Sequence, residues 1–442
     1  MTNKELQELF DIAASATKAD ELFASINIQD RKRIRFAHNR LLETSSVISG
    51  SITISVRFGS QYGSASTSVL DTNGIAACVK QAEQQSLHTP SIESIVPYAG
   101  KAEVKPAPIN LTEPMSIPLH WYTKAGESIL AAADARGVYS SGDVTLSGDQ
   151  LAVFSTHGLF LEQKSTPVHV GVRVFSEDGT CAGFHEMFSY DYSEIDPETV
   201  AKIAIDKCLA WRNPSPPEKI GRMTSVFEPR AFAAMMLPFL QQFDETAFRE
   251  ERSFLKKLDG SSRLGSKMFE DWVNVRSDPY HPTAPSIPFT PDGVPIEPAT
   301  WIKKGVIENA VRSRFEAARE GTSPLPPPSN YIMDGETGTL EDIIASTERG
   351  FLVSGFGGLS IKDVNNCLLN GPTRDGLFLI RDGKIERAVT NLIFNDTPIY
   401  ILERMEKVGA PVKTTPDGVH LPMLLPPIRA TDVLYERTTD LV

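Results

Sequence analysis

The sequence predicts an α+β fold of two domains, an N-terminal domain of repeated β-hairpin and helix units and a β-rich C-terminal domain. Three observations lead to this expectation. The 442 residues exceed what one hydrophobic core usually serves. A hairpin-plus-helix pattern occurs twice in the first half, and short strand patterns dominate the second half. Because consecutive hairpins pair neighbouring strands, we expect mainly antiparallel sheet.

The repeat in the N-terminal half covers residues 51–86 and 167–211. Each copy begins with an alternating strand, SITISVRF in the first and PVHVGVRVF in the second, followed by a turn and another strand. A helix then begins after Asp71 in the first copy and after Asp196 in the second. Pro197 suits the first helical position, where its missing N–H would have no partner.

The predicted domain boundary is the segment NPSPPEK, residues 213–219, whose three prolines stiffen the chain into an extended link. We therefore assign residues 1–213 to the N-terminal domain and 220–442 to the C-terminal domain. Within the latter, the pattern predicts helices at 228–248, where Pro238 should introduce a kink, and at 339–347. The Asp382-Gly383 pair predicts a tight β-hairpin.

Composition excludes several classes of function. The net charge of −12 argues against a nucleic-acid partner, because phosphate binding depends on clustered Lys and Arg. The four cysteines are scattered and form no CxxC pair, which is typical of buried thiols in a reducing compartment. The longest strongly apolar stretch, residues 231–240, is too short to span a bilayer. We expect a cytoplasmic protein without a membrane segment.

Three stretches resemble the TldD/PmbA family. They are residues 35–84, which begin RFAHNRLLETSSVISG, residues 249–279 followed by 289–320, and the segment 335–390, which includes GFGGLS and RDGKIERAV. Their order and spacing carry the resemblance, since no single stretch is as specific as a metal motif. Family members that have the metal site carry HExxxH on a helix and a cysteine near the C-terminus as a third zinc ligand.

This chain departs from that pattern at the metal site. Residues 228–254, where the zinc helix would lie, contain no histidine, and no cysteine follows Cys367. No two of the eight histidines lie within one helical turn, and His420 in the tail is at most a lone substitute. The one His-Glu dipeptide, His185-Glu186, falls on a predicted strand, where adjacent side chains face opposite ways. We therefore predict no catalytic residue, no metal ligand and no cofactor.

Two other segments are candidates for contacts. Gly355, Phe356, Gly357 and Gly358 are typical of a bend where backbone approaches backbone, and the same glycines would let an extended peptide lie along a strand edge. We name these four residues as candidate peptide or partner contacts. Residues 244–252 alternate acidic and basic side chains, which fits either a solvated helix end or a partner surface.

The resemblance implies a role in a pair of subunits. In this family a metal-bearing TldD-like peptidase works with a PmbA-like (TldE-like) companion that lacks the zinc site, and together they trim unfolded peptides. The missing ligands make this chain similar to the companion, which implies a heterodimer with a TldD-like zinc metallopeptidase and an unfolded or extended peptide as substrate. Two alternatives stay open: a stand-alone hydrolase whose active site has moved, and a regulatory protein-binding module.

Overall fold

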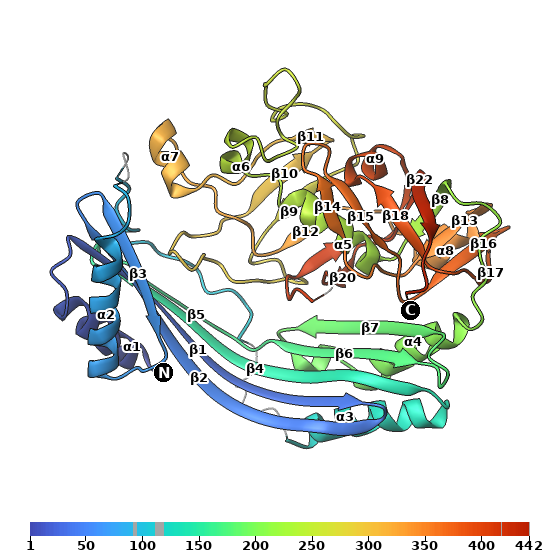
Figure 1. The fold of residues 1–442 in the computed structure, drawn as a ribbon, viewed down its shortest axis with the longest axis horizontal. Helices are drawn as coiled ribbons and strands as arrows, with labels where there is room; N and C mark the ends of the chain where they lie inside the picture. Colours follow the sequence, from blue (N-terminus) through green and yellow to red (C-terminus); the bar gives the residue numbers. More distant parts are fainter. Residues whose placement is uncertain (92–94, 111–118, 417, 442) are drawn as a thin grey trace.

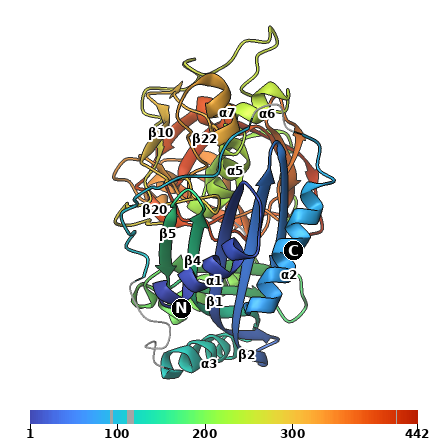
Figure 2. The same cartoon turned by 90° about the vertical axis from the view of Figure 1, so that its left-hand side faces the viewer.

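The computed structural model describes residues 1–91, 95–110, 119–416 and 418–441. One long, curved sheet forms the lower layer, and residues from 222 onward lie on its concave side (Figure 1). A view along the sheet shows the strands rising towards this second part (Figure 2). No helix in these described ranges is long and apolar enough to cross a bilayer.

The curved sheet has seven strands in the order β3-β2-β1-β4-β6-β7, with β5 paired to β4. Every pairing in it is antiparallel. The strands are β1 (Glu21–Ala37), β2 (Arg40–Phe58), β3 (Gln61–Thr67), β4 (Tyr139–Ser155), β5 (Phe160–Ser165), β6 (Val168–Phe175) and β7 (Ala182–Ser189). The helices are α1 (Asn3–Ser15), α2 (Thr72–Ser86), α3 (Leu119–Ala135) and α4 (Pro197–Ala210), with a 3₁₀ turn at Tyr192–Glu194.

The predicted repeat is confirmed as β2-β3-α2 and β6-β7-α4. Asp71 caps α2 and Asp196 caps α4, with Pro197 in the first turn. Each helix lies directly against a glycine of its hairpin. A Cβ on Gly63 would lie 2.0 Å from the Ala82 carbonyl oxygen of α2, and a Cβ on Gly183 would lie equally close to α4. The two units therefore share the same close approach of helix to strand.

The second part contains two further sheets and is strand-rich, as expected. Six strands follow the order β11-β10-β9-β12-β21-β20, and nine form β14-β15-β18-β22-β8-β13-β16-β17 with β19 beside β22. Only β12–β21 and β8–β13 pair in parallel, among the described strands. The strands are β8 (Arg222–Phe227), β9 (Val275–Ser277), β10 (Ala299–Lys303), β11 (Val306–Ile307), β12 (Tyr331–Met333), β13 (Arg349–Val353), β14 (Ser360–Asp363), β15 (Leu368–Pro372), β16 (Leu377–Arg381), β17 (Lys384–Ala388), β18 (Leu392–Asp396), β19 (Met405–Val408), β20 (Val412–Thr414), β21 (Met423–Leu425) and β22 (Ile428–Thr438).

The helices of this part are α5 (Pro229–Leu240), α6 (Glu245–Arg249), α7 (Arg314–Glu320), α8 (Leu340–Ala345) and α9 (Pro398–Glu403). The prediction of a single helix at 228–248 is wrong, because this segment forms two helices, α5 and α6. Pro238 removes one backbone donor near the end of α5, and the Asp244 side chain caps a new helix. The helix predicted at 339–347 is confirmed as α8, and positive φ angles at Asp382 and Gly383 confirm the hairpin turn.

The division into domains at residues 213–219 stays a prediction, and the two parts share a hydrophobic core beside it. Buried residues of α4 pack in one cluster with Val226 and with residues of α8, β13 and β16. The Trp211 indole N–H, just after α4, donates to the Val389 carbonyl oxygen at 2.9 Å. Helix α4 therefore joins the curved sheet to the second part.

Candidate functional site

Helix α5 occupies the position at which the sequence resemblance places the zinc-binding helix. One side of α5, which includes Phe232, Met235 and Phe239, is fully buried in the core of the second part. The opposite, half-exposed stripe lines a cavity of about 280 Å³. Its lining residues are Ala234, Leu237, Pro238 and Gln241 from α5, together with Phe356, Gly358, Leu359 and Pro416.

The chemistry of this stripe does not suit a zinc ion. Zinc sites in proteins are built from Cys, His, Asp and Glu side chains. The α5 residues that line the cavity are apolar, apart from one amide at Gln241. In the part of the chain that the structure describes, no cluster of three or more such ligands could hold a metal. We therefore assign no metal-dependent step to this helix.

The four candidate contact residues lie beside α5. Phe356 and Gly358 line the same cavity, while Gly355 and Gly357 form the backbone on either side of Phe356. Phe356, with its backbone included, is only 2% exposed, and its ring packs against Phe394 with ring centroids 5.1 Å apart. Of the four candidates, Gly357 and Gly358 are the exposed residues.

The backbone at Phe356 has one paired edge and one open edge. The Gly357 N–H donates to the Pro372 carbonyl at 2.8 Å, and the Arg374 N–H donates to the Gly355 carbonyl at 2.9 Å. In this antiparallel bridge, Phe356 opposite Thr373, the N–H and C=O of Phe356 point away from the partner strand. Neither group has a hydrogen-bond partner among the described residues.

Gly355 is required because a charged side chain occupies the space where its Cβ would stand. A Cβ at this position would lie 2.2 Å from Nη2 of Arg230, which comes from the first turn of α5. The predicted approach of backbone to backbone is not what requires this glycine, because the neighbour at Gly355 is a side chain. The Arg230 side chain therefore packs directly against the backbone of this segment.

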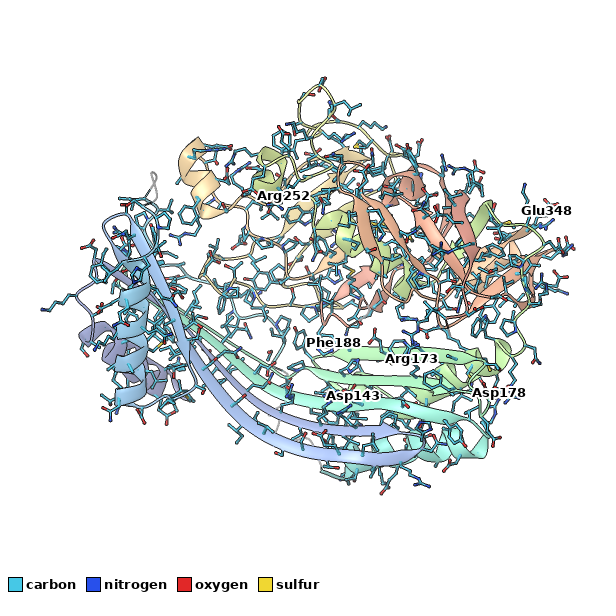
Figure 3. All side chains as sticks on the ribbon, viewed as in Figure 1. Asp143, Arg173, Asp178, Phe188, Arg252 and Glu348 are labelled. Atoms are coloured by element: carbon cyan, nitrogen blue, oxygen red, sulfur yellow. The ribbon has the colours of Figure 1, made fainter. Side chains whose placement is uncertain are left out.

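Arg230 belongs to a buried ion cluster that joins the two parts of the molecule. Its Nη2 lies 2.8 Å from Oδ2 of Asp375, and both nitrogens of the Arg173 guanidinium donate to the same carboxylate. Both guanidinium groups lie over the Phe184 ring, each with its Cζ atom 4.7 Å from the ring centroid. Arg173 projects from β6 into the space below the second part (Figure 3).

The charge of this cluster is fixed at neutral pH. Burial by itself would raise the pKa of Asp375, but the Arg230 and Arg173 guanidiniums outweigh it and lower that pKa. The carboxylate is fully buried, so it remains ionised only because both cations are in contact with it. Sequence reasoning missed the cluster, since Arg173 and Asp375 are 202 positions apart and neither lies in a recognisable motif.

A second group of ionisable side chains meets on the concave face of the curved sheet. His169 on β6 lies 3.2 Å from the Glu186 carboxylate and 3.7 Å from that of Asp143, and its ring centroid is 4.9 Å from that of His420. Burial lowers the pKa of His169, but the two carboxylates reverse this and raise it to about 9. A histidine that carries a proton at neutral pH can act neither as a general base nor as a metal ligand.

The His185-Glu186 dipeptide is split by the strand, as predicted. Glu186 contacts His169 and, from the second part, the hydroxyl of Thr415. On β7 the next side chain, His185, faces the other way, where Lys207 of α4 is among its charged neighbours. Burial first and the Lys207 charge second lower the pKa of His185 to about 4. This histidine is therefore neutral and does not join its neighbour in a site.

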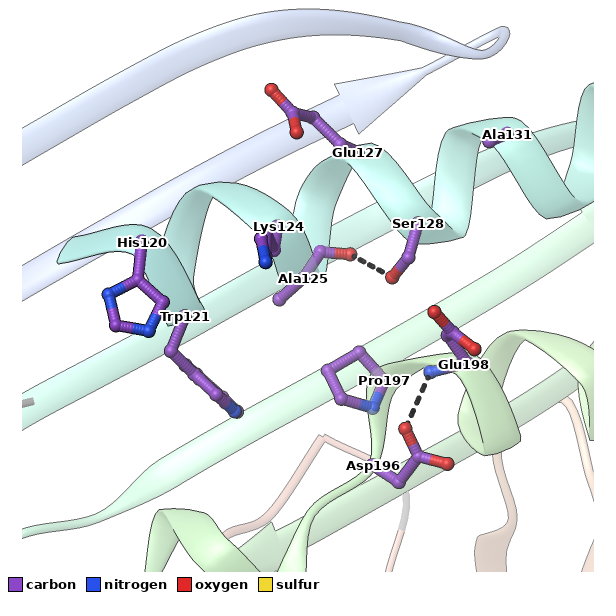
Figure 4. A pocket seen from close by; sticks show the side chains of 10 residues that line it. All are labelled: His120, Trp121, Lys124, Ala125, Glu127, Ser128, Ala131, Asp196, Pro197 and Glu198. Atoms are coloured by element: carbon purple, nitrogen blue, oxygen red, sulfur yellow. Dashed lines mark hydrogen bonds between the residues drawn. The ribbon is translucent and has the colours of Figure 1, made fainter. Parts of the chain in front are cut away.

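A larger groove of about 670 Å³ lies between α3 and the start of α4 (Figure 4). Its polar groups already serve the helices. Asp196 caps α4 by accepting from Glu198 N–H, and the Ser128 hydroxyl donates to the Ala125 carbonyl within α3. Helix α3 lies below the curved sheet, on the side away from the second part (Figure 1), and none of the described residues that line the groove belongs to α5. The groove is therefore separate from the residues around α5.

Comparison with known proteins places these features in a family. Residues 220–433 match the model of the PmbA/TldA metallopeptidase C-terminal domain. A comparison with curated proteins gives no match.

Among solved structures, TldE from Thermococcus kodakarensis is similar with a TM-score of 0.86 at 18% identity, covering 98% of this chain and 100% of that chain. A protein described as a modulator of DNA gyrase from Bacteroides thetaiotaomicron gives 0.83 at 16% identity, with 98% of each chain covered. These likenesses establish one fold over the whole length. Residues 220–433 therefore match the C-terminal domain of the PmbA/TldA family, and the whole chain has the fold of TldE.

Proposed function

We propose that this chain is a non-catalytic, PmbA/TldE-like subunit of a TldD/TldE-type metallopeptidase complex. Its partner is a TldD-like chain that carries the zinc, and the complex trims unfolded peptides. The observation that carries the proposal is the cavity stripe of α5, which offers alanine, leucine, proline and glutamine where a zinc enzyme needs ligands. The likeness to TldE over the whole chain supports the same role.

The role of this subunit in the proposal is to hold substrate in an extended form. The N–H and C=O of Phe356 are unpaired among the described residues, but Phe356 is only 2% exposed, so a peptide would lie along the exposed Gly357 and Gly358 beside it. Main-chain hydrogen bonds along such an edge do not depend on the peptide's sequence, which suits unfolded substrates. The neighbouring cavity of about 280 Å³ has room for one substrate side chain against Ala234 and Leu237.

The alternative of a stand-alone hydrolase has less support. It needs a convergent group of His, Asp and Glu, and the group around His169 has that composition. The two carboxylates, however, raise the pKa of His169 to about 9. The protonated imidazole can then serve neither as a general base nor as a metal ligand. We read this group as a structural contact of the curved sheet with Thr415 and His420.

We place the complex in the cytoplasm and expect no nucleic-acid partner. All four cysteines are free thiols and buried, which suits a reducing compartment. The net charge of −12 disfavours phosphate binding. We also retain residues 1–213 and 220–442 as two domains that rest on the shared α4 core.

A binding experiment tests the substrate-holding role. The isolated chain is titrated with a fluorescein-labelled, unstructured peptide of seven residues and with the same peptide N-methylated at successive positions. Methylation at a residue opposite Gly357 or Gly358 should weaken binding, because it removes a donor. Ala234→Leu should weaken binding roughly tenfold by filling the cavity. Ala14→Leu, at a half-buried alanine of α1, is the control. Equal binding by all three proteins would refute this role.

A further inference from the structure

A second cavity, of about 570 Å³, lies at the other end of the curved sheet. Strands β1, β2 and β3 form its floor, and the segment 96–98, residues 291–292 and the start of α7 form its walls. Figure 1 shows α7 above this end of the sheet, at a distance from α5. The volume is within the range of small-ligand sites, roughly 300–1,000 Å³. Neither the family match nor the proposed function uses this cavity.

The floor of the cavity is made of small hydroxyl side chains on one face of the sheet. Ser25 pairs with Thr53 across β1 and β2, and Ser55 pairs with Ser64 across β2 and β3. The Ser55 and Ser64 oxygens are 3.0 Å apart, and the Thr53 hydroxyl lies 2.8 Å from that of Ser66. The floor is therefore uncharged and made of short side chains.

The walls of the cavity are aromatic. Tyr62 meets Tyr98 edge to face at 6.0 Å between centroids and meets Phe315 at 6.4 Å, while Phe23 and Tyr98 are 5.7 Å apart. The Tyr62 hydroxyl donates to the Val96 carbonyl at 2.9 Å, which fixes that ring. Burial raises the pKa of Tyr98 above its ordinary value, so its phenol stays neutral. Phe315, in contrast, is 45% exposed.

The two charged residues at the rim are engaged within the chain. Arg314 donates to the Pro97 carbonyl, and Asp292 accepts from the Thr290 hydroxyl. A charged ligand would have to disrupt these contacts, whereas an aromatic ring would gain edge-to-face contacts and cover Phe315. The lining therefore favours a neutral aromatic group over an acidic or basic one.

We propose that this cavity binds a neutral aromatic side chain, phenylalanine or tyrosine, of an extended peptide. The inference rests on the proposed peptide-binding role and adds a side-chain preference at a site distant from α5. The volume exceeds what one ring fills, so the adjoining main chain of the peptide would enter with it.

The test uses blocked amino acids, which are too short to form a strand along Gly357 and Gly358. Binding of N-acetyl-phenylalaninamide, N-acetyl-alaninamide and N-acetyl-aspartamide to the full chain is measured by saturation-transfer NMR. Phenylalanine should bind about fivefold more tightly than alanine or aspartate. Phe315→Ala should remove most of this preference, and Ser64→Phe should block the cavity. Tyr400→Ala, at another aromatic that is 45% exposed, is the matched control.

The outcomes separate this inference from the proposed function. Equal binding of the three amides, or a phenylalanine preference that Phe315→Ala leaves intact, would overturn the aromatic site. Thermal melting of each variant shows whether it is folded, and Phe315→Ala keeps the test decisive should Ser64→Phe misfold. Ala234→Leu should not change amide binding. If the phenylalanine amide is preferred at this cavity but the peptide titration shows no effect of Ala234→Leu, only the proposed peptide-binding edge beside α5 is refuted.

Discussion

Replacing Asp375 with asparagine removes the negative charge of the ion cluster while keeping the shape of the side chain. Asp375 is fully buried, and its φ angle of 64° lies in a region that asparagine also tolerates. The substitution therefore tests the charge rather than the backbone. It removes the carboxylate that the Arg173 and Arg230 guanidiniums both contact, and the side chains of these arginines are only 21% and 8% exposed.

The expected loss of stability is about 3–5 kcal/mol at pH 7, since breaking a buried ion pair leaves an uncompensated charge. Urea unfolding followed by circular dichroism measures it, provided the transition is two-state. Asp382→Asn is the matched control: Asp382 also has a positive φ angle, 50°, but lies exposed in a hairpin turn. We expect the control to change stability by less than about 0.5 kcal/mol.

The pH dependence gives a second check on the same variant. The pKa of Asp375 in the folded protein is lowered below its ordinary value of 3.8. Its stabilising contribution is therefore present above about pH 4 and is lost as the pH falls through the folded pKa. The difference between wild type and Asp375→Asn should shrink only in that acidic range. A loss below about 1 kcal/mol at pH 7, or one that does not depend on acid, would refute the role given to this cluster.

Three further predictions follow from single contacts. The pKa of His169 is raised from 6.5 to about 9, so its contribution to stability is complete below pH 6.5 and disappears as the pH rises through 9; an NMR titration with a midpoint near 6.5 would contradict the ion cluster. Gly355→Ala should cost about 1–3 kcal/mol because its Cβ would meet Arg230, whereas Gly100→Ala, with ordinary contacts, should cost little in the same unfolding assay. Burial raises the pKa of Cys208 to about 12, and all four cysteines are buried, so no thiol should react with Ellman's reagent until the protein unfolds; a fast-reacting thiol in the native protein would be inconsistent with this burial.

Local patterns made part of the fold predictable. The caps at Asp71 and Asp196 and the alternating strands gave both hairpin-helix units, because these signals lie within a few neighbouring residues. The length of β2 was not predictable in the same way. It begins at Arg40, well before the alternating residues 51–58, and its first half has exposed side chains on both faces and thus no period of two.

The site was predictable only where it is local in sequence. The absence of histidine from residues 228–254 and the glycines around Phe356 could be read directly, and the structure brings both to one cavity. The ion cluster at Asp375 and the group around His169 depend on tertiary contacts between residues far apart in the chain. Periodicity and spacing carry no signal for such contacts.

The central claim is that this subunit has no zinc site of its own and works with a zinc-bearing partner. Native mass spectrometry of the tagged chain, purified from its own host, tests this claim most directly. The account predicts a complex with a second chain of similar mass and one zinc ion. The zinc should remain with the partner when the two chains separate. A metal-free homodimer without a companion would contradict the account, and so would zinc bound to this chain alone.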